Sequence, residues 1–223
     1  MKTTQPLKRP KFPAPPKLPR STPALEIGEL EDGQRFAQGW LRGSQLPDQR
    51  VRSLTFDGCR MEQVNLCGGE LPRWTWIDCD LQGCNLANVE GDDTSLLRTS
   101  LRNCKLSGIR LPDAVWRDVD FSDCKLDYAS LQGLKAKNVR LRNCDLREAE
   151  FYGCQFESLQ CLQCNLGRAA FTNCRFEVCE FQGCDLTGLR GLSNLSGVRM
   201  PAADLLAIAV ALAGELGIGV IAD

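Results

Sequence analysis

The amino-acid sequence places a hydrophobic residue at every fifth position over most of its length. Reading every fifth residue from Phe36 to Leu186 gives 31 positions, of which 24 are Leu or Phe. Eight of the nine Phe residues fall on this one phase. A period of five fits neither the 3.6-residue turn of a helix nor the two-residue alternation of a long strand. The pattern therefore predicts a chain that changes direction once in every five residues.

A second regular position lies two residues before each of these hydrophobic residues. Small or β-branched residues fill most of it, and eleven of the thirteen cysteines lie there. The residue just before it is often Gly or Asn, which turns favour. We expect each repeat to form a short extended side with two inward side chains, followed by a corner.

Residues twenty positions apart match in type, which sets the number of sides in each coil. Leu fills every twentieth position from Leu46 to Leu186, and Cys does so from Cys84 to Cys184. Trp116 is followed twenty residues later by Ala136, so a large side chain is paired with a small one. These columns predict four repeats per coil. With coils about 4.8 Å apart, nearly eight coils give a rod roughly 37 Å long.

This pattern resembles the pentapeptide-repeat family, whose consensus is A-[D/N]-L-x-x. The resemblance covers residues 34–190, and the segments that carry it include Cys84-Asn85-Leu86, Cys144-Asp145-Leu146, Cys164-Asn165-Leu166 and Cys184-Asp185-Leu186. It implies an all-β solenoid, a right-handed quadrilateral β-helix. Gly91 interrupts the hydrophobic phase, which leaves open a loop or bulge in the stretch that follows it.

The repeats and their lead-in span residues 25–190, and two further segments flank them. Residues 1–24 hold seven of the eleven prolines, six basic residues and no acid. Such a composition cannot build a core and favours an extended, polyproline-like chain. We expect a disordered basic leader, the alternative being a docking segment for a partner or an anionic surface.

The C-terminal segment, residues 191–223, is expected to form an α-helical cap and a short strand at 217–221. Pro201 suits the first position of a helix, and the apolar residues that follow spread around much of its circumference. A helix that is apolar on several sides must be covered on several sides. One side is expected to close the solenoid, and the other to meet a second copy, as C-terminal segments of the family often do. The candidate cap and dimer interface is Leu205, Leu206, Ile208, Val210 and Leu212.

The cysteines allow metal ligation, redox chemistry or disulfide formation besides simple packing. Free Cys packs like a small hydrophobic residue and is among the most buried residue types. Its position here also accepts Val, Ala and Thr, and the chain has no His to complete a tetrahedral metal site. We interpret the cysteines as interior filler.

The sequence gives no support to an enzyme. The absence of His removes the commonest general base. Nucleophile-elbow, phosphate-loop and dinucleotide motifs are also missing, and paired acids such as Asp92 and Asp93 are interpreted as solvated surface. We expect no catalytic residue, no cofactor and no metal.

The favoured function is a non-catalytic scaffold that binds another protein, whose identity the sequence does not give. The family resemblance adds the alternative of a bacterial DNA mimic that binds and protects DNA gyrase. That mechanism requires a markedly acidic surface, whereas residues 51–190 carry 20 acids against 17 bases. A second alternative from the family is a secreted effector.

Direct nucleic-acid binding and membrane insertion are not expected. The net charge is −1, and no 18-residue apolar run occurs. The basic start is not followed by an apolar core, and the number of cysteines is odd, which favours a reducing compartment. The expected location is the cytoplasm.

Overall fold

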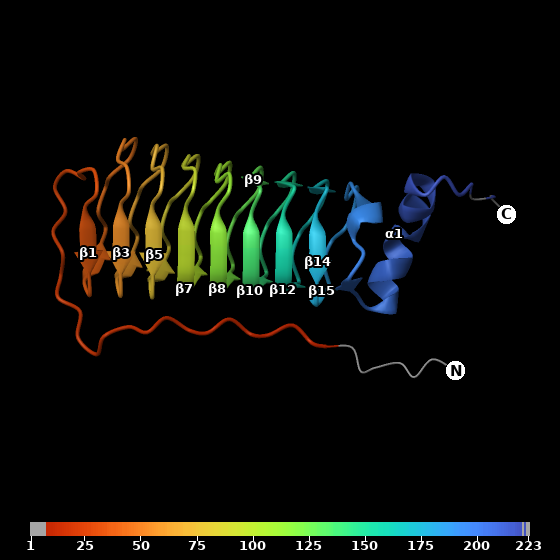
Figure 1. Ribbon diagram of the computed structural model, residues 1–223, viewed down its shortest axis with the longest axis horizontal. Coiled ribbons are helices and arrows are strands. Elements are labelled where there is room, and N and C mark those ends of the chain that lie inside the picture. The colour runs from red at the N-terminus through yellow and green to blue at the C-terminus, as the bar shows by residue number, and fades with distance from the viewer. Residues whose placement is uncertain (1–7, 220, 222–223) are drawn as a thin grey trace.

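The computed structural model describes residues 8–219 and 221. The chain winds into a parallel β-solenoid of about eight coils, a right-handed β-helix closed at one end by a helix (Figure 1). Residues paired across neighbouring coils are twenty apart, as in Phe36 with Phe56 and Trp116 with Ala136. This register confirms four repeats per coil.

Each coil contributes short strands to a 13-stranded and a three-stranded sheet. The longest strands, β7, β8, β10 and β12, each run through a corner. The strands are β1 (Arg35–Ala37), β2 (Trp40–Arg42), β3 (Thr55–Asp57), β4 (Arg60–Glu62), β5 (Thr75–Ile77), β6 (Asp80–Gln82), β7 (Ser95–Arg102), β8 (Val115–Ser122), β9 (Ser130–Gln132), β10 (Lys135–Arg142), β11 (Glu150–Tyr152), β12 (Gln155–Leu162), β13 (Ala170–Thr172), β14 (Arg175–Glu177), β15 (Cys179–Gln182) and β16 (Val198–Arg199).

The corners recur at every fifth residue, as the sequence predicts. Each corner residue has a positive φ, for example 65° at Gly58, 52° at Asp78 and 52° at Asn103. Gly, Asn and Asp tolerate this left-handed conformation best. Val178, a β-branched residue with φ 55°, adopts it as well, because the coils on either side fix the backbone.

The interior is a continuous core of inward side chains. Equivalent aromatic rings stack from coil to coil, with centroids 4.6 Å apart for Phe151 and Phe171 and 5.0 Å apart for Phe156 and Phe176. Gly91 does not disturb the order, since its amide donates to the carbonyl of Arg110 at 3.0 Å. A β-carbon at Gly91 would lie 2.5 Å from the Leu71 carbonyl oxygen and 3.1 Å from the Trp74 indole nitrogen. Gly is therefore required there for packing, and the ladder contains no bulge.

Most of the cysteines share one structural role, at the position two residues before the hydrophobic series; Cys67 and Cys161 lie elsewhere. The Cys79 thiol lies 3.4 Å from the carbonyl oxygen of Phe56, 23 residues earlier, and Cys164 makes the same contact with Leu141 at 3.4 Å. Thr99 places its hydroxyl 3.4 Å from the carbonyl of Trp76 in the same way. The position thus selects a small side chain with a weak donor, and all thirteen cysteines are free thiols. Burial raises the pKa of Cys79 and that of Cys179, the latter to about 11.

The C-terminal end is closed by η1 (Leu192–Asn194) and α1 (Ala202–Glu215). The amides of Gly191 and Ser193 donate to the Glu215 carboxylate at 3.0 and 2.9 Å, and that of Gly183 donates to Asp204 at 2.8 Å. The strand of this segment, β16, precedes the helix. Residues 217–219 form no strand, and Val220 lies outside the described residues.

Candidate functional site

The five apolar residues expected at the cap divide between two faces of α1. Ile208 is 4% exposed and Leu212 is half-buried against the core. Leu206 and Val210 are 74% and 67% exposed, and Leu205 is also exposed, at 46%. Ile208 and Leu212 therefore attach the helix to the solenoid, while Leu206 and Val210 face outward.

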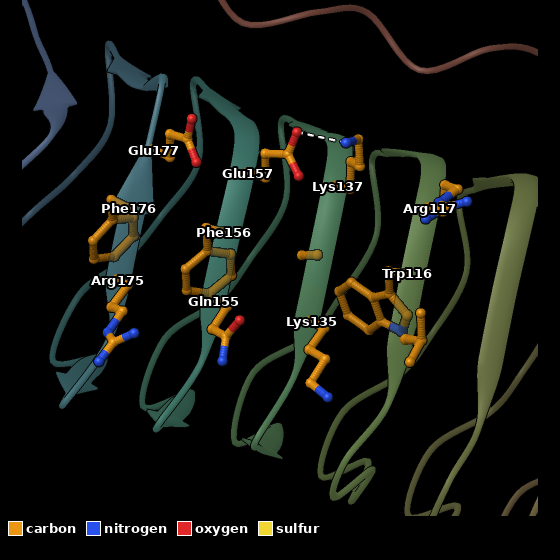
Figure 2. Close-up of a pocket in the computed structure, with 12 residues that line it drawn as sticks. Trp116, Arg117, Lys135, Lys137, Gln155, Phe156, Glu157, Arg175, Phe176 and Glu177 are labelled. Carbon is orange, nitrogen blue, oxygen red and sulfur yellow. Dashed lines mark ion pairs between the residues drawn. The ribbon is translucent and has the colours of Figure 1, made fainter.

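A shallow groove of about 460 Å³ crosses the face formed by β8, β10, β12 and β14. Two rows of outward side chains border it, and the inward residues Trp116, Phe156 and Phe176 lie beneath (Figure 2). Neighbouring members of a row are one coil apart, about 4.8 Å. The upper row is Arg117, Lys137, Glu157 and Glu177, and the lower row is Val115, Lys135, Gln155 and Arg175.

The charges of the upper row are segregated along the solenoid axis, whereas the lower row carries only the bases Lys135 and Arg175. The upper row changes from basic to acidic between Lys137 and Glu157, whose side chains form an ion pair at 2.5 Å (Figure 2). A carboxylic acid that donates a proton at neutral pH is normally kept protonated by burial. The Glu157 side chain is 51% exposed and already paired. This geometry suits recognition of a charged, extended segment better than proton transfer.

Elsewhere, several acids on the outer faces form ion pairs with bases one coil away. Arg98 and Asp78 approach to 2.6 Å, as do Arg140 and Asp120, and Arg110 approaches Glu90 to 2.5 Å. Such a ladder alternates charge along the axis at intervals of about 4.8 Å. It therefore gives the faces that it covers a mixed charge instead of the single-sign surface of a nucleic-acid duplex.

The described part of the leader follows one corner of the solenoid, and residues 1–7 of the segment expected to be disordered lie outside the described residues. Residues 8–19 run beside the coils from the β15 end toward the β1 end (Figure 1). The amides of Lys11, Ala14 and Lys17 donate to Ser158, Asp118 and Asp78 at 2.5, 3.1 and 2.9 Å. Sequence reasoning missed these contacts.

Asp78 is the most strongly held of these acceptors. Arg98 donates to both of its carboxylate oxygens at 2.6 Å. This guanidinium, together with the Lys17 amide, lowers the pKa of the Asp78 carboxyl below its ordinary value, although burial opposes the shift. Asp78 is therefore a charged acceptor, prepared by the next coil for the leader amide.

The described residues contain neither a cluster of metal ligands nor a membrane-spanning helix. No three His, Cys, Asp or Glu side chains within 8–219 and 221 group as ligands for a metal ion. Over the same residues, no helix combines the length and apolar character needed to cross a bilayer.

Comparison with known proteins supports the repeat assignment. Residues 74–151 match the family model described as a pentapeptide repeat region. A comparison with curated proteins gave no match.

Several solved structures are similar at low identity. Full-length QnrB1, a plasmid-mediated fluoroquinolone resistance protein, is 15% identical over 81% of this chain and 100% of its own, with a TM-score of 0.44. HetL from Nostoc sp. strain PCC 7120, a pentapeptide-repeat protein involved in heterocyst differentiation regulation, is 14% identical over 77% and 91%, with a TM-score of 0.30. The Agl-KA catalytic domain is 11% identical over 78% and 47%, with a TM-score of 0.32. These scores carry no functional argument, whereas the family match shows a pentapeptide repeat region over residues 74–151, and corners at every fifth residue continue the same repeat along the solenoid.

Proposed function

We propose that this protein is a non-catalytic scaffold that binds an extended segment of another protein in the groove across β8, β10, β12 and β14. The separation of charge along the upper row of that groove carries the proposal. Arg117 and Lys137 suit acidic residues of a partner, and Glu157 and Glu177 suit basic residues further along. Rigid coils hold these charges at fixed spacing, which limits the entropy lost on binding. A reducing cytoplasm suits the thirteen free thiols.

The test combines site-specific photo-crosslinking with charge reversal. A photo-crosslinker at Lys135, in the groove, is expected to capture a partner that a crosslinker at Arg110, on another face, does not capture. Exchanging the two inner charges of the upper row with K137E and E157K keeps their mutual ion pair but turns the segregated row into an alternating one, so affinity for that partner should fall at least about tenfold. Equal capture at both positions, or unchanged affinity after reversal, would remove the groove from the function.

The same protein can be tested for binding to one named partner, DNA gyrase. The ion-pair ladder argues against duplex mimicry. We therefore expect no protection of gyrase supercoiling from ciprofloxacin at micromolar protein. Protection would replace the groove proposal with the DNA-mimic alternative.

A homodimer through α1 is a second proposal, supported by the outward side chains of Leu206 and Val210. The double variant L206D/V210D is expected to sediment as a monomer under conditions in which the wild type is a dimer. The variant A207D, which changes a residue between these two in the sequence, is the control for added charge. A wild type that stays monomeric at every concentration tested would refute this interface.

A further inference from the structure

The corner beneath the leader differs from the other corners in its chemistry. We name it the leader corner, and its residues, one per coil, are Gly58, Asp78, Arg98, Asp118, Asn138, Ser158 and Val178. Every second coil offers an acceptor to the leader, at Asp78, Asp118 and Ser158. The coils between them supply donors that hold two of these acceptors in place, Arg98 on Asp78 at 2.6 Å and Asn138 on Asp118 at 3.0 Å.

The leader presents a matching period of three. Its prolines at 10, 13, 16 and 19 recur every third residue, and the three bonded amides belong to the residues that follow three of them, Lys11, Ala14 and Lys17. A polyproline II helix has three residues per turn, a rise of about 3.1 Å per residue and no internal hydrogen bonds. Its amides are therefore free to donate outward, one on each turn.

The two periods agree in length. Three residues of polyproline II advance about 9.3 Å, and two coils of the solenoid advance about 9.6 Å. Each turn of the leader thus meets the next acceptor two coils on, without a break in register over the span from Asp78 to Ser158.

Burial supports a built site at this corner. Six polar residues of the described chain are buried, and three of them, Asp78, Ser158 and Gln160, lie along the leader. Ser158 uses its hydroxyl twice, accepting from the Lys11 amide and donating to the Lys11 carbonyl at 3.3 Å. Pro10 is itself buried, and the Arg140 guanidinium lies 5.3 Å from the Phe12 ring centroid.

We infer that the leader corner is a binding site for polyproline II segments with proline at every third residue, and that the leader is its resident ligand. Recognition uses backbone amides on successive turns, so the site selects the proline period more than the side chains between. The site adjoins the upper row of the groove, whose residues directly precede those of the leader corner in sequence, but the inference does not depend on the proposed scaffold function. In the intact chain the leader occupies the site and competes with any segment from another protein, at an effective concentration in the millimolar range.

The test uses the full-length chain with its leader released. Replacing Pro10, Pro13, Pro16 and Pro19 by Ser removes the fixed φ that favours polyproline II and should open the corner. The probe is a fluorescein-labelled peptide with the sequence of residues 8–21, titrated by fluorescence anisotropy. A peptide of the same composition, with its prolines moved off the three-residue period, controls for charge.

The opened variant is expected to bind the leader peptide at least about tenfold more tightly than the wild type does, because the cis leader no longer competes. Adding D118G should weaken this binding about tenfold. Adding D123G should not, although Asp123 accepts from Asn143 as Asp118 does from Asn138. Gly suits the positive φ at both positions. No binding to the opened variant, or equal binding of the shuffled peptide, would overturn the inference.

Discussion

Two neighbouring corners of the solenoid have the same backbone conformation but differ in what covers them. From Gly58 to Val178 the leader corner is buried or half-buried throughout, because the leader lies on it. The corner five residues further along each coil, which we name the bare corner, is exposed at all of its positions. The bare corner consists of Gln63, Gly83, Asn103, Asp123, Asn143, Gln163 and Gly183.

The difference shows that fold and recognition are encoded at different positions of the same repeat. Both corners have φ near 50–70° at their described positions, and both enclose the same hydrophobic interior. Only the leader corner places an acceptor, Asp or Ser, on every second coil. The donors Arg98 and Asn138 lie on the coils between these acceptors. We conclude that the interior sets the coil and that the corner side chains decide what binds to it.

The largest expected effect comes from the interior that both corners share. Phe121 is fully buried, and Phe121→Ala should lower the free energy of unfolding by about 3–5 kcal/mol through lost burial and a cavity. Urea denaturation measures this. Asp123→Gly, two residues away on the bare corner, is the matched control and should change stability little. Similar losses in both variants would contradict the division between interior and corner.

The next effect concerns the thiols that lie behind the two corners. Cys79 and Cys179 follow leader-corner residues, and Cys84 through Cys184 follow bare-corner residues. With its pKa raised to about 11 by burial, Cys179 carries about a hundredfold less thiolate than an ordinary thiol near pH 8. A thiol reagent should modify only Cys67 and Cys184, the two half-buried thiols, in the native protein. Rapid native labelling of a buried thiol behind either corner, such as Cys79 or Cys84, would show that the interior is open there.

A smaller effect separates the corners directly. Removing one acceptor with Asp118→Gly should raise the rate of tryptic cleavage after Lys17 by about tenfold, the equivalent of one charge-assisted hydrogen bond. Asp123→Gly should leave that rate unchanged, since Asp123 lies on the bare corner. Equal cleavage of the two variants and the wild type would mean that the corner does not hold the leader.

The smallest effect is a pH dependence at one end of the leader. The Asp78 carboxyl has a pKa lowered below its ordinary value of 3.8 by Arg98 and the Lys17 amide. A lowered pKa contributes stability above the ordinary value, and this is lost as pH falls through the lowered value. Below that pH, amide exchange should rise at Lys17 relative to Lys11, whose acceptor Ser158 does not titrate. A constant ratio would contradict this role for Asp78.

The sequence predicted the interior, the corners and the register well, and it did so for a physical reason. Each of these features repeats about thirty times, so the inward Leu, Phe and Cys positions report one geometry again and again. The need for Gly91 was harder to predict, because it depends on how closely Trp74 and Leu71 approach this one residue. The path of the leader could not be predicted. The path requires the three-residue period of the leader to match acceptors that lie forty residues apart in the solenoid. These acceptors are as different in type as Asp78 and Ser158.

The candidate groove also lay beyond the sequence. Its two rows combine residues of four coils, and the change of charge between Lys137 and Glu157 has no counterpart in the repeat pattern. The outward position of Leu206 and Val210 on α1 agrees with a helix that has two apolar sides, and dimerisation there stays a prediction.

Amide hydrogen exchange of the leader, measured residue by residue by NMR in the wild-type chain, tests the central claim most directly. Leader docking predicts slow exchange at Lys11, Ala14 and Lys17, at least about tenfold below the rate of an unfolded chain. Phe12 and Leu18, for whose amides the described residues provide no acceptor, should exchange freely. Uniformly fast exchange at all five amides would contradict the account and leave the leader disordered.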